Sequence, residues 1–266
     1  MKDEKLSFFF IPILLLSTNT IKISSNQEKI TITILYDNYT LGEGTKSDWD
    51  FSCIVEGTEK TILFDAGYKE NILKHNIDTL NIDVNKVEIV FLSHNHLDHT
   101  GGLNEVTSKN SNLELYFGKS FPENMESKYL EKGIKSVRIE GPREICKNVF
   151  TSGELKGRAN EQSLIVNTNK GIVIITGCSH PGIINIIERV KELHKGKIYM
   201  VIGGFHLLEF SNNKIEKIIN RMKESGVEFC GPSHCTGDNA ISLFKQAYRE
   251  KYINLGVGKK IEIEIE

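Results

Sequence analysis

Three histidines and one aspartate lie within six residues of the chain, in the segment 93–102. His94 and His96 are two residues apart, so both imidazoles can turn to one side of an extended loop. Asp98 and His99 follow after a single spacer and can face a second point nearby. Imidazole nitrogen and carboxylate oxygen are typical ligands of zinc, iron and manganese. The loop can therefore serve two neighbouring metal ions. A polar surface loop is the weaker interpretation, because the chain has only 8 histidines.

The sequence on either side of this loop also favours a functional site. Residues 87–92 are apolar and β-branched with one acid, which predicts a buried strand, and residues 103–106 begin a helix-like stretch. The loop then lies at the C-terminal end of a strand, which is where α/β folds position their ligands.

Three later histidines also follow predicted strands, and each precedes a helix-like stretch. With the preceding strand in parentheses, they are His180 (171–176), His206 (197–202) and His234 (227–230). If these strands end at one edge of the fold, all three histidines join the first loop. His75 and His194 lie instead in predicted helices among polar residues, and we expect them to face solvent without a role.

Each later position has a structural alternative. His180 precedes Pro181, which can open a helix, so it is either a capping histidine or a metal ligand in a tight loop. We expect His234 to be the last ligand of a second metal, whereas His206 is either a ligand or a proton donor to the substrate. For the cysteines near these loops, core packing or a free thiol is the default, because their spacing matches no zinc ribbon. These cysteines are Cys178, Cys230 and Cys235.

Strand and helix patterns alternate through the rest of the chain. Strands are predicted at 30–36, 51–56, 61–64, 113–117, 137–139, 163–167 and 260–265, in addition to those named above. Helices are predicted at 68–76, within 119–135, and at 183–194, 214–225 and 239–249. The predicted α/β fold is one αββα four-layer sandwich, with two mixed β-sheets face to face and helices on the outer faces.

The composition argues against several classes of protein. The 266 residues are 39% hydrophobic and 26% charged, with a net charge of −2, so no nucleic-acid partner is predicted. Five cysteines lack the spacing of a disulfide framework. No apolar run is long enough to predict a stable membrane span.

Residues 1–28 form an N-terminal extension ahead of a domain predicted to span residues 29–266. Residues 6–16 are apolar except for Ser7, which fits the apolar part of a signal peptide better than a membrane helix. No convincing cleavage site follows, and the charged start is nearly neutral. We therefore expect a dispensable extension, or a start assigned too far upstream, on a cytoplasmic protein. The alternative is secretion or membrane association.

The order His-x-His-x-Asp-His at a strand end resembles the signature of the metallo-β-lactamase superfamily. Five further segments occur in the order Leu-Tyr-Asp-Asn (35–38), Leu-Phe-Asp-Ala-Gly (63–67), Thr-Gly-Cys-Ser-His-Pro-Gly-Ile (176–183), Gly-Gly-Phe-His-Leu (203–207) and His-Cys-Thr-Gly (234–237). Together they resemble the branch that includes the archaeal dihydropterin-methyl-(ribofuranosyl)aminobenzene-5′-phosphate synthases. The resemblance runs from about Lys29 to the C-terminus.

The resemblance implies further roles. Asp65 matches an aspartate that orients the histidine loop. Cys178 stands where many relatives carry a metal-bridging aspartate, so thiolate ligation is the alternative to a packed thiol. One histidine motif of the superfamily is missing, so His180 or His206 must substitute for it. From their positions, Asp37 can line the opening of the site, and Glu161 can also reach it.

We therefore predict a dinuclear metal-dependent hydrolase of an ester or phosphoester, acting on a small-molecule substrate through a metal-bridged hydroxide. Two divalent ions are expected, zinc first, with manganese or iron as alternatives. The predicted ligands are His94, His96 and His180 for one ion, and Asp98, His99 and His234 for the other. Asp98 would also orient the nucleophile, and His206 would donate a proton to the leaving group.

Two other functions remain open. One is a synthase that uses a pterin diphosphate, in which the metals would hold the leaving diphosphate. The other is a non-catalytic metal-binding module. Ligands spread over four loops disfavour that module, because a structural metal site needs fewer.

Overall fold

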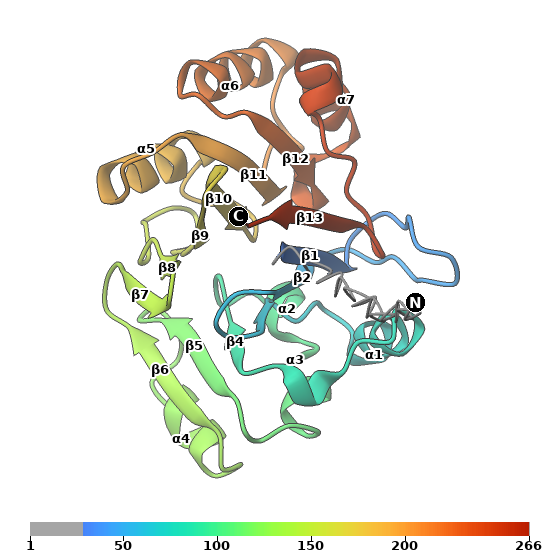
Figure 1. Cartoon of the computed structure of the whole chain (residues 1–266), viewed down its shortest axis with the longest axis vertical. Coiled ribbons are helices and arrows are strands. Elements are labelled where there is room, and N and C mark those ends of the chain that lie inside the picture. The colour runs from blue at the N-terminus through green and yellow to red at the C-terminus, as the bar shows by residue number, and fades with distance from the viewer. Residues whose placement is uncertain (1–28, 266) are drawn as a thin grey trace, which may run out of the picture.

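Two mixed sheets make up the centre of the protein, whose computed structural model describes residues 29–265 (Figure 1). The first sheet has seven strands in the order β13-β1-β2-β3-β4-β5-β6, and the second has six in the order β12-β11-β10-β9-β8-β7. Strands β3 to β6 pair in parallel, as do β10 to β12, and the remaining pairs are antiparallel.

The strands are short, and most are buried along their length. Their bounds are β1 Lys29–Tyr36, β2 Ser52–Glu56, β3 Ile62–Phe64, β4 Ile89–Phe91, β5 Glu114–Gly118, β6 Lys135–Ile139, β7 Arg143–Cys146, β8 Val149–Thr151, β9 Leu164–Thr168, β10 Gly171–Thr176, β11 Ile198–Gly204, β12 Phe229–Ser233 and β13 Lys260–Glu264.

The α-helices are α1 Glu70–Thr79, α2 Leu97–Thr100, α3 Leu103–Thr107, α4 Met125–Leu130, α5 Ile183–Leu193, α6 Asn212–Glu224 and α7 Asp238–Tyr248. Short 3-10 turns lie at Val84–Lys86, His234–Thr236 and Arg249–Lys251. In residues 29–265 none of the helices combines the length and apolar character that crossing a membrane would require.

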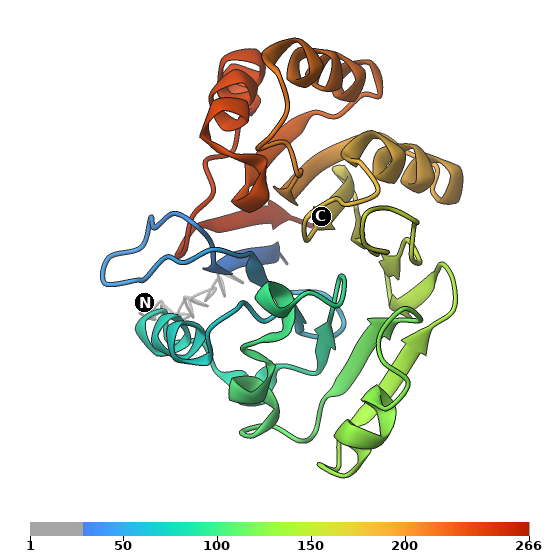
Figure 2. The same cartoon turned by 180° about the vertical axis from the view of Figure 1, so that it is seen from behind.

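Three apolar clusters separate the four layers. One lies between the sheets and includes Ile32, Phe64, Val173 and Ile202. A second packs α1, α3 and α4 on the outer face of the first sheet, and a third packs α5, α6 and α7 on the outer face of the second. Figures 1 and 2 show these two helical layers on opposite sides of the sheets. The predicted αββα sandwich is confirmed, and β13, within the strand predicted at 260–265, lies at the edge of the first sheet.

Two features of the second sheet differ from the sequence-based expectation. Strands β7 and β8 were not predicted, because β7 is short, charged and largely exposed, and so lacks the apolar alternation of a typical strand. Strand β12 runs further than predicted, through Gly231 and Pro232 to Ser233, because it pairs in parallel with β11 up to Gly204. This register carries the loops after both strands to the same edge of the sheet.

Candidate metal centre

The predicted site residues meet at the edge of the sandwich where its parallel strands end. Strands β3 and β4 end there in the first sheet, and β10, β11 and β12 end there in the second. The segments after them carry, in that order, Asp65, residues 93–102, residues 177–182, His206 and His234. Because the C-terminal ends of parallel strands share an edge, residues distant in sequence come into contact there.

Three histidines form the first cluster. The Nε2 atom of His94 lies 3.1 Å from Nδ1 of His96. The ring centroid of His180 is 4.7 Å from that of His94 and 4.8 Å from that of His96. One nitrogen of each ring lies within 4.8 Å of the others. His180, rather than His206, therefore completes the set begun by the first loop.

The second cluster contains Asp98, His99, Cys178 and His234, whose donor atoms also lie within 4.8 Å of one another. The sulfur of Cys178 is 3.2 Å from Nε2 of His99 and 3.2 Å from Nε2 of His234. The Oδ2 atom of Asp98 is 3.8 Å from the same two nitrogens. The thiol of Cys178 thus sits among the predicted ligands.

These spacings match those of ligands around a divalent ion. At a tetrahedral zinc, ligand atoms bound at about 2.0–2.3 Å lie roughly 3.3–3.8 Å apart. The nitrogen–nitrogen contact of 3.1 Å and the two sulfur–nitrogen contacts of 3.2 Å are within a few tenths of an ångström of that range. The donor set is nitrogen, oxygen and sulfur, which suits zinc. Both clusters therefore fit a metal ion.

Most of the imidazoles have their other nitrogen held by a neighbouring side chain. The pairs are His94 Nδ1 with Ser93 Oγ at 2.9 Å, His99 Nδ1 with Asp65 Oδ2 at 2.7 Å, His180 Nδ1 with Glu161 Oε2 at 3.0 Å, and His234 Nδ1 with Asn38 Oδ1 at 3.3 Å. Such contacts fix the tautomer and the direction of a ring whose free nitrogen binds a metal. The free Nε2 atoms of these rings point into the clusters.

Asp65 ties the first loop to the rest of the fold. Its Oδ1 atom accepts a hydrogen bond from the Ser93 backbone N–H at 2.7 Å, and its Oδ2 atom accepts one from the Ser93 hydroxyl at 2.7 Å. A Cβ atom at Gly177 would lie 2.3 Å from that hydroxyl oxygen and 3.1 Å from Oδ2 of Asp65. Glycine is therefore required at position 177 for the two loops to approach each other.

Four residues at the strand ends have left-handed backbone conformations. Their φ angles are 52° for Asp65, 61° for Ser179, 53° for His206 and 51° for His234. For residues other than glycine this conformation costs on the order of 1 kcal/mol each, and it is frequent at functional sites. The sharp turn lets each chain leave its strand and direct a side chain across the edge.

The charge state of the histidines is set by their surroundings. Burial and neighbouring histidines hold the pKa of His94 and of His234 well below the usual value, so both rings are neutral and can coordinate a metal. Burial also opposes the charged form of His99, but the carboxylates of Asp50 and Asp65 outweigh it and raise the pKa of His99 to about 10. A cation at the second cluster therefore has to displace a proton from His99.

His206 belongs to a third group, with Cys178 and Cys235, whose donor atoms lie within 4.8 Å of one another. Burial alone raises the pKa of Cys235, but interactions with Cys178 and His206 outweigh it and lower this pKa to about 6. The interaction with Cys235 in turn raises the pKa of His206. The Nδ1 atom of His206 is buried and makes no hydrogen bond of standard geometry to any described residue.

Three residues differ from the expectation in position or importance. Asp37 does not line the opening of the site, because it is fully buried and accepts hydrogen bonds from the Ser233 hydroxyl at 2.7 Å. Asp50 was not predicted at all, although its carboxylate lies 3.4 Å from Nδ1 of His99. Asp50 follows a loop in which polar composition was the only indication of a function in the sequence. Cys235 is a buried free thiol, as expected, but it lies at the site.

The two other histidines of the chain and Cys230 lie away from the clusters. His75, on α1, contacts the Gly44 carbonyl oxygen at 2.8 Å. His194, at the end of α5, packs on Phe150 with a centroid distance of 4.6 Å. Both are half-buried rather than fully solvent-facing. Cys230 is fully buried among the outer helices.

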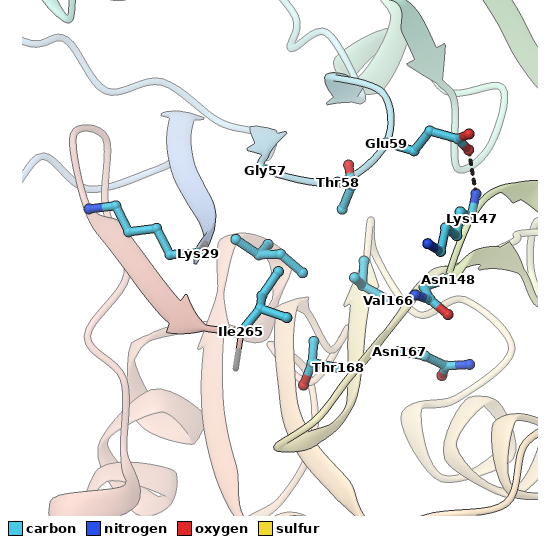
Figure 3. Close-up of a pocket in the computed structure, with 11 residues that line it drawn as sticks. Lys29, Gly57, Thr58, Glu59, Lys147, Asn148, Val166, Asn167, Thr168 and Ile265 are labelled. Carbon is cyan, nitrogen blue, oxygen red and sulfur yellow. Dashed lines mark hydrogen bonds between the residues drawn. The ribbon is translucent and has the colours of Figure 1, made fainter. Parts of the chain in front are cut away.

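A cavity of about 690 Å³ opens at the opposite end of the sandwich. Figure 3 shows it between Lys29 at the start of β1, Thr58 after β2, and Thr168 at the end of β9. Its described lining contains no histidine or cysteine. It therefore has no part in the metal centre.

Comparison with known proteins adds three similarities. The family model described as metallo-beta-lactamase superfamily matches residues 51–143. The 7,8-dihydropterin-6-methyl-4-(beta-D-ribofuranosyl)-aminobenzene-5'-phosphate synthase of Methanocaldococcus jannaschii is 33% identical over 252 residues, covering 77% of this chain and 85% of that protein. An uncharacterized protein of the same organism is 31% identical over 259 residues, covering 85% of this chain and 98% of its own.

One solved structure is similar in both sequence and fold. Tm1679, described as a metal-dependent hydrolase of the beta-lactamase superfamily, has a TM-score of 0.72 and 31% sequence identity. The similarity covers 88% of this chain and 99% of that one.

Proposed function

Because the chain belongs to the metallo-β-lactamase superfamily, we propose that it is a dinuclear metal-dependent hydrolase of a small-molecule ester or phosphoester. The observation that carries this proposal is the pair of adjacent donor clusters at one strand edge. A lone structural site would need only one closed set of four ligands. Two sets that share an edge instead suit a reaction in which two ions act on one substrate.

We assign His94, His96 and His180 to the first ion. Asp98, His99, Cys178 and His234 are assigned to the second. Zinc is favoured, because imidazole and thiolate together suit it better than manganese. When bound, the ions would supply Lewis acidity, lowering the pKa of a water and polarising the bond under attack.

The side chains around the ions would orient the reactants. The side chain of Asp98 is 26% exposed, whereas that of His99 beside it is fully buried. Asp98 can therefore accept a hydrogen bond from the attacking water. His206 lies 4.6 Å from His180 between ring centroids. Its raised pKa supports a role as proton donor to the leaving group.

Metal content together with turnover tests this proposal. Zinc-loaded protein should hold two zinc ions per chain and hydrolyse bis(4-nitrophenyl) phosphate. His96→Ala should retain one zinc ion and lose activity by at least about 100-fold. His75→Ala is the matched control, because His75 lies on α1 and contacts the Gly44 carbonyl, outside both clusters. One zinc ion in the wild type, without turnover, would contradict the proposal.

The only tryptophan of the chain gives a second readout. The ring of Trp49 lies 5.0 Å from that of His234 between centroids, in an edge-on arrangement. Zinc binding at the second cluster should therefore change the tryptophan fluorescence. An unchanged signal during a titration that loads both sites would argue against His234 as a ligand.

A second candidate function is a synthase of the kind named for the Methanocaldococcus jannaschii relative. The identity of 33% over most of that protein favours it. The two clusters would then hold the ions that bind a leaving diphosphate. Release of diphosphate from a pterin diphosphate only when an aminobenzene acceptor is present would support this function over hydrolysis.

A further inference from the structure

A second cavity, of about 560 Å³, lies beside the metal centre. It is bounded by the start of α5, the segment that follows β11, and one side of α6. Apolar side chains form much of its lining, among them Ile183, Ile184, Phe205, Phe210 and Ile218. This volume lies within the range of about 300–1,000 Å³ that is typical of small-molecule sites.

The cavity and the metal centre share a wall. Two of the residues that line the cavity are His180, of the first cluster, and His206. Their rings are 4.6 Å apart between centroids. A molecule that reacts at the clusters can therefore extend past these two rings into the cavity.

Charged groups lie at the mouth of the cavity. The side chain of Arg158 is 71% exposed, and its Nη1 atom lies 3.4 Å from Nε2 of His206. Lys214 on α6 also lines the cavity, with its Nζ atom 3.5 Å from the centroid of the Phe210 ring. The acid of the lining is Glu209, which lies 3.9 Å from Arg158.

The balance of these charges favours the binding of an anion. Arg158 and Lys214 carry two positive charges against the single negative charge of Glu209, so the mouth has a net charge of +1. The contact of 3.9 Å between Arg158 and Glu209 joins two side chains that are 71% and 78% exposed, and such a pair contributes little stability. An incoming carboxylate or phosphate can replace Glu209 and form charge-assisted hydrogen bonds with Arg158.

We propose that this cavity binds the non-reacting part of the substrate, an apolar group that carries an anionic substituent. The apolar group would lie against Ile184 and Phe210, and the anion would lie at the mouth, between Arg158 and Lys214. This assignment of a substrate class rests on the proposed function, because the bond to be cleaved must lie at the clusters.

Two fluorescent probes that differ by a single charged group test the proposal. They are 8-anilinonaphthalene-1-sulfonate and N-phenyl-1-naphthylamine, which has the same rings without the sulfonate. Zinc-loaded protein should bind one molecule of either probe, and the sulfonate should bind more tightly. Both probes should compete with the hydrolysis of bis(4-nitrophenyl) phosphate. Binding is measured without turnover, so the cavity can be tested even if hydrolysis is absent.

Three variants separate the anion site from the apolar site. Arg158→Ala/Lys214→Ala should weaken binding of the sulfonate about tenfold and leave binding of the neutral probe unchanged. Glu209→Gln should strengthen sulfonate binding about two- to threefold, because it removes the competing carboxylate. Ile184→Asp should lower the affinity for both probes by at least about tenfold. Ile184 is half-buried, and zinc content checks that this variant is folded.

Lys217→Ala is the matched control, because Lys217 lies on α6, is exposed and does not line the cavity. It should bind both probes like the wild type. The proposal is overturned if the neutral probe binds Ile184→Asp normally, since the probe then occupies another surface. It is also overturned if removing Arg158 and Lys214 has no more effect on the sulfonate than Lys217→Ala. If the probes bound but no substrate was hydrolysed, the proposed function would be rejected, and the cavity would still be supported as a binding site for an apolar anion.

Discussion

The buried carboxylate of Glu161 lies 3.0 Å from Nδ1 of His180 and also holds the loop that carries this histidine. It accepts hydrogen bonds from the four successive backbone N–H groups of residues 177–180, at 2.8–3.1 Å. Burial opposes ionisation, but the bonds from His180 and its neighbours hold the pKa of Glu161 below the usual value. Glu161 thus holds His180, which we propose as a metal ligand, in place.

Glu161→Gln should lower the zinc affinity of the first cluster about 10- to 100-fold, because the amide cannot reproduce both the charge and the acceptors of the carboxylate. Competition with a chromophoric chelator measures this affinity. The second zinc ion should remain bound. The control is Glu154→Gln, which changes an acid that accepts hydrogen bonds from the backbone N–H and the hydroxyl of Ser120. If Glu161→Gln and the control bound zinc at the first cluster with equal affinity, Glu161 would not position His180.

Cys178 should be a ligand of the second ion. The cobalt-loaded protein should therefore show thiolate-to-cobalt charge-transfer absorption in the near ultraviolet, and Cys178→Ser should abolish it. The thiolate forms only when a metal displaces the proton, because burial raises the pKa of the Cys178 thiol well above its usual value. Cys235→Ser should retain the absorption. Loss of the band in Cys235→Ser alone would instead assign the sulfur ligand to Cys235.

Asp37 should make the protein less stable as the pH rises. Burial raises the pKa of Asp37 from 3.8 to about 7 in the folded protein, against hydrogen bonds from Ser233 and Tyr39. Between these pH values the folded chain holds a proton that the unfolded chain has lost. The contribution of this carboxyl to stability is therefore lost as the pH rises through about 7.

Asp37→Asn removes this dependence. The free energy of unfolding of Asp37→Asn minus that of the wild type should increase by about 2.5 kcal/mol from pH 5 to pH 8. Urea unfolding at several pH values measures the difference. Asp78→Asn, an exposed change on α1, should show no such trend. If the difference in free energy of unfolding between Asp37→Asn and the wild type did not change with pH either, the carboxyl of Asp37 would be ionised in the folded protein.

Sequence reasoning identified the fold and the members of the site better than the arrangement within it. Histidines that directly follow strands are visible in the chain, because strand periodicity and the glycines beside them are local signals. The choice between His180 and His206 was not visible. It depends on the register of β10 against β11, which places His180 next to His94 and His206 next to Cys235.

Residues that orient the ligands were the hardest to predict. Glu161 and Asp50 act across loops that are remote in sequence from His180 and His99, and their function depends on burial that no local pattern encodes. The role of Asp65 was easier to predict, because Asp65 lies in a segment that resembles a known family motif. Strands β7 and β8 were not predicted for a related reason. They form because β7 pairs with β8 and β8 pairs with β9, and their own composition does not indicate a strand.

Anomalous X-ray scattering at the zinc edge, from crystals of the zinc-loaded protein, would locate each zinc ion in the dinuclear centre. We predict two peaks per chain. One should lie within bonding distance of His94, His96 and His180, and the other should lie within bonding distance of Asp98, His99, Cys178 and His234. A single peak enclosed by four protein ligands, with no second ion at the neighbouring cluster, would contradict the dinuclear centre.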